Sequence, residues 1–103
     1  MITPDENRLI LLADIFKALA NPGRLALLEK LQNGPRCVCE LAAELGMNKS
    51  IASKHLSQLQ DTGLVRSSKK GITVNYELVA PCVLEMSACT LNSVKKEMSS
   101  RFQ

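Results

Sequence analysis

The sequence is short of aromatic residues, histidine and long apolar runs, and each shortage excludes a class of protein. Aromatic residues make up 3% of the 103 residues and tryptophan is absent, so the core must be aliphatic. No apolar run approaches the roughly 18 residues that a membrane-spanning helix needs. A single histidine, no glycine-rich phosphate loop and no nucleophile–base arrangement make the chain a poor candidate for an enzyme.

Length and cysteine usage describe a small protein of a reducing compartment. A chain of 103 residues, 46% of them apolar, can build one core but not two, so we expect a single domain over residues 1–103. The first residues lack the basic region and apolar stretch of a signal peptide, which favours the cytoplasm and no membrane partner. The four cysteines are then expected to be free thiols or metal ligands rather than disulfides.

The net charge of +3 is concentrated in the middle of the chain. Residues 47–79 carry five basic and two acidic side chains, which gives +3, whereas residues 1–46 carry five basic and six acidic ones, which gives −1. A charge of this size is ordinary for a soluble domain. Its placement nevertheless favours a surface in the central segment that faces phosphates.

Apolar residues at helical spacing predict a series of helices in the first two thirds of the chain. One helix is expected over about 7–20, and a second is opened by Pro22. A third, shorter helix is expected from Cys37 onward, and Asn48 caps a fourth. The buried face of the fourth helix is expected to consist of Ala52, Leu56 and Leu59.

The hydrophobic period then changes from that of a helix to that of a strand. The apolar positions of the expected strand are Ile72, Val74, Tyr76 and Leu78, which alternate with polar residues. Together with residues 64–68, and with Lys69-Lys70-Gly71 as the connection, this stretch predicts a β-hairpin over about 64–78. Pro81 opens a last helix, over about 81–99.

Short helices followed by a hairpin is the order of elements in a winged helix-turn-helix, a mainly α fold with a β-hairpin wing (α+β). The helix-turn-helix is expected over about 37–62, and its second helix enters the major groove of DNA. Serines and lysines can approach base edges and phosphates, and a basic hairpin can reach the adjacent minor groove or backbone. The expected DNA contacts are Lys49, Ser50, Ser53, Lys54, His55, Ser57, Gln58, Arg66, Lys69 and Lys70. The alternative is a solvated polar helix face beside an ordinary charged turn.

Four segments carry a family resemblance: residues 16–24 (FKALANPGR), residues 37–42 (CVCELA), residues 50–56 (SIASKHL), and Gly63-Leu64-Val65 with the hairpin after it. They resemble the ArsR/SmtB family of metal-sensing bacterial repressors. The resemblance implies a homodimer held by the first and last helices, which binds an imperfect palindrome in double-stranded DNA and is released by an inducer. Gly23 departs from the threonine usual at that position, and Ile51-Ala52 from the usual Ala-Val.

Cys37 and Cys39 match the Cys-Val-Cys thiolate site of this family. Soft thiolates prefer As(III), Cd(II), Pb(II) and similar ions, and a helix N-terminus beside Arg36 would favour the thiolate form. In a regular helix, residues i and i+2 point about 200° apart, so both sulfurs could grip one ion only if the first helical turn unwinds. We therefore expect inducer binding to unwind that turn and to displace the helix that reads DNA.

The remaining ligands are left open. Ala42 stands where the arsenite sensors of the family often place a third cysteine, so Cys82 and Cys89 are the other thiols available. One of them could complete the site, from the same or the other subunit, or both could be small core residues. Residues 80–103 contain no histidine, which argues against the nitrogen and oxygen sites of the zinc and nickel sensors. As(III) is favoured as inducer, then Cd(II) or Pb(II), and no cofactor is required for DNA binding.

Two other functions compete with this interpretation. A repressor of the same fold could respond to thiol oxidation or persulfides, through a bridge from Cys39 to Cys82 or Cys89. A thiol oxidoreductase or interaction module that does not touch DNA is the third possibility. The basic hairpin and the serine and lysine face argue against it.

Overall fold

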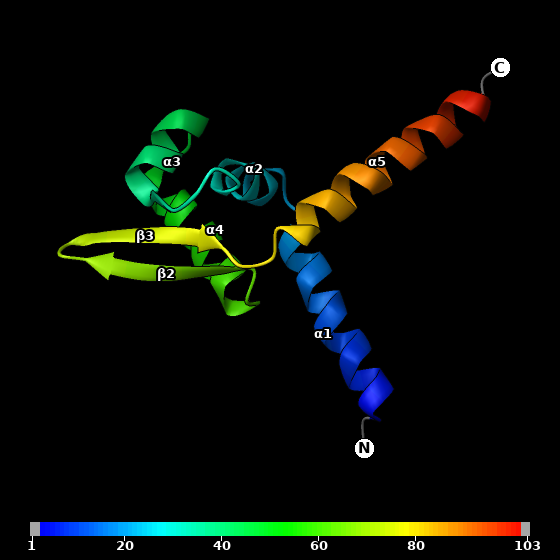
Figure 1. Ribbon diagram of the computed structural model, residues 1–103, viewed down its shortest axis with the longest axis horizontal. Helices are drawn as coiled ribbons and strands as arrows, with labels where there is room; N and C mark the ends of the chain where they lie inside the picture. Colours follow the sequence, from blue (N-terminus) through cyan, green and yellow to red (C-terminus); the bar gives the residue numbers. More distant parts are fainter. Residues whose placement is uncertain (1–2, 102–103) are drawn as a thin grey trace.

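The computed structural model of the protein describes residues 3–101 and has the element order of a winged helix-turn-helix (Figure 1). In chain order the elements are α1 (Pro4–Leu19), α2 (Pro22–Leu31), β1 (Arg36–Cys37), α3 (Val38–Leu45), α4 (Lys49–Asp61), β2 (Val65–Lys70), β3 (Thr73–Leu78) and α5 (Cys82–Arg101). The mainly α fold with a hairpin wing is therefore confirmed.

Side-chain caps determine where the helices begin. Thr3 and Glu6 form a capping box at the start of α1, and the Asn21 side chain accepts a hydrogen bond from the backbone N–H of Arg24 in α2. The Asn48 side chain accepts from two N–H groups in the first turn of α4. Gly46 ends α3 in a left-handed conformation, which few other residues adopt without strain. The turn between α3 and α4 is thus set by local chemistry.

The core lies between α2, α3, α4 and the base of the wing. Its fully enclosed side chains are Leu27, Leu28, Leu41, Leu56, Leu59, with Leu31 and Val65 almost as deeply buried. Among the described residues, every buried side chain is a leucine, a valine or an alanine, as the shortage of aromatic residues predicts. Ala52, Leu56 and Leu59 face this core, so the expected buried face of the fourth helix is confirmed. The opposite face of α4 is therefore turned to solvent.

The sheet contains a strand that the hydrophobic pattern does not reveal. Its order is β1-β3-β2, and in the antiparallel pairing Arg36 lies opposite Tyr76 and Cys37 opposite Asn75. The segment Arg36–Cys37 is too short to show any period, so only its pairing with β3 identifies it. The stretch before α3 is consequently extended, not helical.

The tip of the wing also differs from the expectation. The strand β2 continues through Lys70, and Gly71 with Ile72 forms the turn, where Gly71 has a φ of 63°. Ile72 is 98% exposed, so its predicted place on the buried face of the strand is wrong. The reason is the pairing of Lys70 with Thr73, which leaves Ile72 outside the ladder.

The helices α1 and α5 extend away from the body on the side opposite the wing (Figure 1). They are buried only where they join the body, at Ala18 and Leu19 in α1 and at Val83 and Leu84 in α5. Beyond those points they expose the large apolar side chains Leu9, Ile10, Leu11, Leu12, Phe16, Met86, Leu91, Val94 and Met98. Within residues 3–101, no helix combines the length and the apolar character needed to cross a membrane.

Candidate nucleic-acid interface and thiol site

The outer face of α4 is polar, basic and exposed. Lys49, Ser50, Lys54 and Ser57 are all exposed, and Ser53 is half-buried. Neither Lys49 nor Lys54 forms an ion pair within the described part of the chain, so their charge is available to phosphates. This surface faces solvent because the opposite, apolar face of α4 packs against the core.

His55 and Gln58 lie beside Arg24 of α2 rather than on this outer face. The Arg24 guanidinium donates to Gln58 Oε1 at 2.9 Å, and its Nη1 is 3.4 Å from His55 Nδ1. The same guanidinium donates to the backbone carbonyls of Ala18 at 2.5 Å and Lys17 at 3.2 Å, at the end of α1. Arg24 therefore joins α1 to α4. No hydrophobic pattern reveals this role, because it depends on side chains distant in the sequence.

The absence of a side chain at Gly23 matters for the packing of His55 against α2. A Cβ atom at this position would lie 3.3 Å from His55 Nε2 and 3.1 Å from Asn21 Oδ1, which is closer than ordinary contact. The glycine that replaces the usual threonine thus leaves room for the His55 ring against α2.

The wing presents two lysines next to its tip. Lys69 and Lys70 are exposed at the end of β2, directly before the turn. Arg66, further down the same strand, is hydrogen-bonded and ion-paired to Glu77 on β3. Of the three expected wing contacts, the two lysines have unpaired charge within the described residues, whereas the charge of Arg66 is matched across the hairpin.

Cys37 and Cys39 do not both lie in a helix, which corrects the expected geometry. Cys37 ends β1 and caps α3 with extended backbone angles, φ −83° and ψ 157°, whereas Cys39 lies in the first turn of α3. The argument that places their side chains about 200° apart applies only to a continuous helix. The geometric argument for unwinding α3 therefore does not apply to this pair, and the predicted unwinding step loses its basis.

Both thiols border one hollow of about 380 Å³ on the surface of the protein. One wall is formed by Cys37, Val38 and Cys39, a second by Lys49 and Ser53 of α4, and a third by Ile72, Thr73, Val74 and Tyr76 of the wing. Cys37 is half-buried and Cys39 is exposed. The hollow thus lies between the thiols and the two elements that carry the expected DNA contacts.

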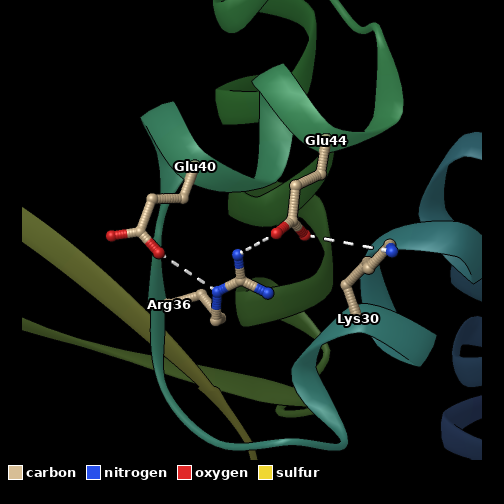
Figure 2. A network of polar contacts seen from close by, with 4 residues as sticks. All are labelled: Lys30, Arg36, Glu40 and Glu44. Carbon is tan, nitrogen blue, oxygen red and sulfur yellow. Dashed lines mark hydrogen bonds and ion pairs between the residues drawn. The ribbon is translucent and has the colours of Figure 1, made fainter.

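The Arg36 guanidinium points toward the carboxylates of Glu40 and Glu44 (Figure 2). Its Nε lies 3.2 Å from a Glu40 oxygen and its Nη2 lies 2.6 Å from a Glu44 oxygen, while Lys30 Nζ is 3.9 Å from the other Glu44 oxygen. The hydrogen bond from Arg36 lowers the pKa of the Glu44 carboxyl, and the hydrogen bonds to Glu44 and Glu40 raise the pKa of Arg36. Arg36 therefore ties β1 to α3, and its expected role beside a thiolate is not supported.

The other two cysteines lie on α5. Cys82 begins the helix, Cys89 follows, and both are exposed, so neither is a core residue of the protomer. Within residues 3–101, no three cysteine, histidine or acidic side chains are grouped so that they could hold one metal ion. One protomer thus offers two thiols to a ligand in the hollow, and no third cysteine, histidine or acidic side chain among the described residues is grouped with them.

Comparison with known proteins identifies the family. Residues 21–67 match the family described as "Bacterial regulatory protein, arsR family". The chain is 39% identical over 75 residues to an uncharacterized HTH-type transcriptional regulator, MJ1325 of Methanocaldococcus jannaschii. This match covers 72% of the present chain and 84% of MJ1325. The chain belongs to the ArsR family. It is therefore a DNA-binding transcriptional regulator and not an enzyme, as the sequence predicts.

Further relatives agree with this assignment. The chain is 41% identical over 66 residues to the HTH-type transcriptional regulator NmtR of Mycobacterium tuberculosis, although it spans only 55% of that protein. Among solved structures, the homodimeric winged helix-turn-helix domain of Mb0332 from Mycobacterium bovis matches with a TM-score of 0.79 at 30% identity, over 93% of this chain and 89% of that one. The AntR antimony-specific transcriptional repressor matches with a TM-score of 0.72 at 35% identity, over 96% and 88% of the two chains.

Proposed function

We propose that this ArsR-family regulator is a dimeric, cytoplasmic repressor that leaves its operator when a thiophilic metal or metalloid binds Cys37 and Cys39. As(III) is the favoured inducer, followed by Cd(II) or Pb(II). The observation that carries the proposal is the shared hollow, in which both thiols lie beside Lys49 and Ser53 of α4 and beside the wing. A ligand there acts directly next to the elements expected to hold DNA.

The preference for soft ions follows from the donor set. Thiolate sulfur binds As(III), Cd(II) and Pb(II) in preference to hard cations, and no histidine or carboxylate joins the two thiols in a three-donor group among residues 3–101. The likeness to a repressor named as antimony-specific supports a metalloid in particular. Cys82 or Cys89 of the partner subunit remains available as a third sulfur ligand.

Inducer binding is proposed to act through the junction of β1 and α3. Cys37 belongs to a strand that pairs with the wing, and Cys39 to a helix that packs on α4. A ligand that bridges the two sulfurs changes how strand and helix meet, and so changes the position of the wing relative to α4. Because both must fit one DNA half-site, a small displacement weakens binding.

The dimer is proposed to form through α1 and α5. Both helices leave the body with large apolar side chains exposed, among them Phe16 at 47% and Leu91 at 55%. Large apolar side chains exposed in this number are typical of a subunit interface. The homodimeric state given for the Mb0332 domain supports this arrangement. A twofold dimer then presents two copies of α4 to the two halves of an imperfect palindrome.

The test measures fluorescence anisotropy of the protein on DNA from upstream of its own gene. Arsenite and then Cd²⁺ are titrated in the presence of a phosphine reductant, so that no small thiol competes for the ligand. We expect arsenite to release the wild-type protein and the Cys82→Ser/Cys89→Ser variant, but not Cys37→Ser/Cys39→Ser. DNA binding that neither ion changes would contradict the proposal, and absence of DNA binding would contradict the repressor itself.

A thiol-oxidation switch is the second candidate, favoured by the exposure of Cys39, Cys82 and Cys89. The same anisotropy assay distinguishes this switch from a metal response. Release by a mild oxidant that the phosphine reverses, together with indifference to arsenite and Cd²⁺, would replace the metal response by a redox response.

A further inference from the structure

We infer that Ile51, in the first turn of α4, contacts the 5-methyl group of a thymine in each half of the operator and so helps to specify the DNA sequence. The inference rests on the DNA binding of the proposed function and not on its inducer response. Three observations support it: the exposure of this side chain, its place on α4, and the fixed backbone that carries it.

Ile51 is a large apolar side chain that the protomer leaves in water. It is 51% exposed, and it lies outside the buried face of α4, which consists of Ala52, Leu56 and Leu59. Most other exposed large apolar side chains lie on α1 and α5, where the proposed dimer would bury them. Helix formation does not require Ile51 either, because isoleucine is a weaker helix former than alanine. Its apolar surface is therefore available to a partner of the protein.

The neighbours of Ile51 on the outer side of α4 are polar and exposed. Residues three or four apart lie on the same side of a helix, and Lys54 follows Ile51 at this spacing. Ser50 precedes it in the first turn, and both neighbours are exposed. In a helix-turn-helix, the N-terminal residues of the second helix contact base edges in the major groove. Ile51 thus lies at the end of α4 that is expected to reach the bases.

Thymine is the base that an isoleucine side chain can recognise. An aliphatic side chain neither donates nor accepts a hydrogen bond, so it cannot read the donors and acceptors of a base edge. The 5-methyl group of thymine is the only methyl group that the four standard bases present in the major groove. Contact between this group and the Ile51 side chain removes apolar surface of both from water, which is favourable.

The first turn of α4 holds Ile51 in place before DNA binds. The Asn48 side chain accepts hydrogen bonds from the backbone N–H of Ser50 at 2.8 Å and of Ile51 at 3.3 Å. Ala52, the next residue, is fully buried, so this turn packs on the core. A β-branched side chain in a helix also occupies mainly one χ1 rotamer. Contact with the methyl group therefore costs little conformational entropy.

The experiment replaces each thymine of the bound upstream DNA in turn by deoxyuridine and measures the affinity by fluorescence anisotropy without inducer. Deoxyuridine pairs as thymidine does but lacks the 5-methyl group. We expect a position in each half-site at which deoxyuridine weakens binding of the wild-type protein about fourfold, and about 15-fold when both half-sites are substituted.

Two variants at position 51 assign this effect to the isoleucine. Serine and isoleucine have similar helix propensities, so Ile51→Ser changes an exposed side chain without weakening α4. It should bind thymine and uracil DNA equally at the sensitive position. Ile51→Val keeps a branched apolar side chain and should keep most of the difference.

Two further variants separate the methyl contact from other effects on DNA binding. Ile72→Ser makes the same change at the turn of the wing and should leave the uracil effect at the sensitive position unchanged. Lys54→Gln removes a charge beside Ile51, so it should weaken binding to thymine and uracil DNA alike and lower the salt dependence of binding. Ile51→Ser removes no charge and should leave the salt dependence as it is in the wild type.

The outcomes separate this inference from the proposed function. A protein that binds the operator and leaves it with arsenite, but shows no uracil effect in either half-site, would overturn the inference and leave the proposed function standing. A uracil effect that persists undiminished in Ile51→Ser, or that is lost equally in Ile72→Ser, would also overturn it. If the protein does not bind the upstream DNA, the inference and the repressor function fall together.

Discussion

Arg36 shows how one residue organises the thiol site without touching a thiol. It stands directly before Cys37, but its guanidinium turns to Glu40 and Glu44 of α3. Lys30 of α2 reaches the same Glu44 carboxylate from the other side. The strand that carries Cys37 is thus tied to the helix that carries Cys39 by charge-assisted hydrogen bonds.

Glu44→Gln is expected to reduce stability at neutral pH and to have no such effect in acid. The hydrogen bond from Arg36 lowers the Glu44 pKa from its ordinary value of 4.5. A carboxyl with a lowered pKa in the folded state contributes stability above about pH 4.5, and this stability is lost as the pH falls through the folded-state pKa. Melting temperatures of wild type and variant, measured by circular dichroism across this range, should therefore converge in acid.

Glu29→Gln is the matched control, because Glu29 is exposed on α2 and forms no ion pair within residues 3–101. It should match the wild type at neutral pH. If the melting temperature of Glu44→Gln equalled that of the Glu29→Gln control, the ion pairs of Glu44 with Arg36 and Lys30 would add nothing to stability.

At the scale of elements, the end of α1, the start of α2 and the middle of α4 meet at one side chain. Arg24 donates to the carbonyls of Lys17 and Ala18 and to the side chain of Gln58. The carbonyls at the C-terminus of a helix have no partner inside it, so a cation there is favourable. Arg24 consequently couples the helix of the expected dimer interface to the helix expected to read DNA.

Arg24→Ala should destabilise the fold by about 1–3 kcal/mol, because it removes the part-buried hydrogen bond to the Ala18 carbonyl. Urea denaturation followed by circular dichroism measures this change. Arg8→Ala, which removes an exposed arginine from the first half of α1, should leave the unfolding midpoint almost unchanged. Equal midpoints for the two variants would refute the coupling role of Arg24.

For the whole molecule, the decisive feature is that the expected DNA-binding surface and the exposed apolar surface of α1 and α5 lie on opposite sides. The wing projects from one side of the body, and α1 with α5 projects from the other (Figure 1). The thiols of Cys37 and Cys39 and the polar residues Lys49 and Ser53 lie on the side of the wing, and most of the exposed large apolar side chains lie on α1 and α5. This separation allows two copies to associate through one side and still present both α4 helices to DNA.

Leu91→Glu is expected to convert the dimer to a monomer and to weaken binding to the palindromic operator. In a twofold interface the change occurs twice, and burial of each leucine contributes about 1.5–3 kcal/mol, so the dimer should weaken by more than ~100-fold. Sedimentation velocity measures the association state. Val79→Glu, outside α1 and α5, serves as control and should remain dimeric; a Leu91→Glu protein that stays dimeric would place the interface elsewhere.

Local chemistry in the sequence determined the order of the elements and the face that α4 presents. The spacing of Ala52, Leu56 and Leu59, the cap at Asn48 and the alternation in β3 each depend on residues that are close in sequence, so they could be predicted. The Cys-Val-Cys pair could likewise be named as a thiol site by resemblance alone.

Tertiary structure decided what surrounds those residues. Cys37 is extended because β1 pairs with β3, and the hollow exists because β1, α4 and the wing meet there. Arg24 reaches α4 and the end of α1 because the fold brings these segments, which are distant in sequence, to the same place. Periodicity reports which side of a helix or strand is apolar, but it cannot report which distant segment lies against it. The thiol residues were therefore determined by the sequence, and the shape and lining of their site by long-range pairing and packing.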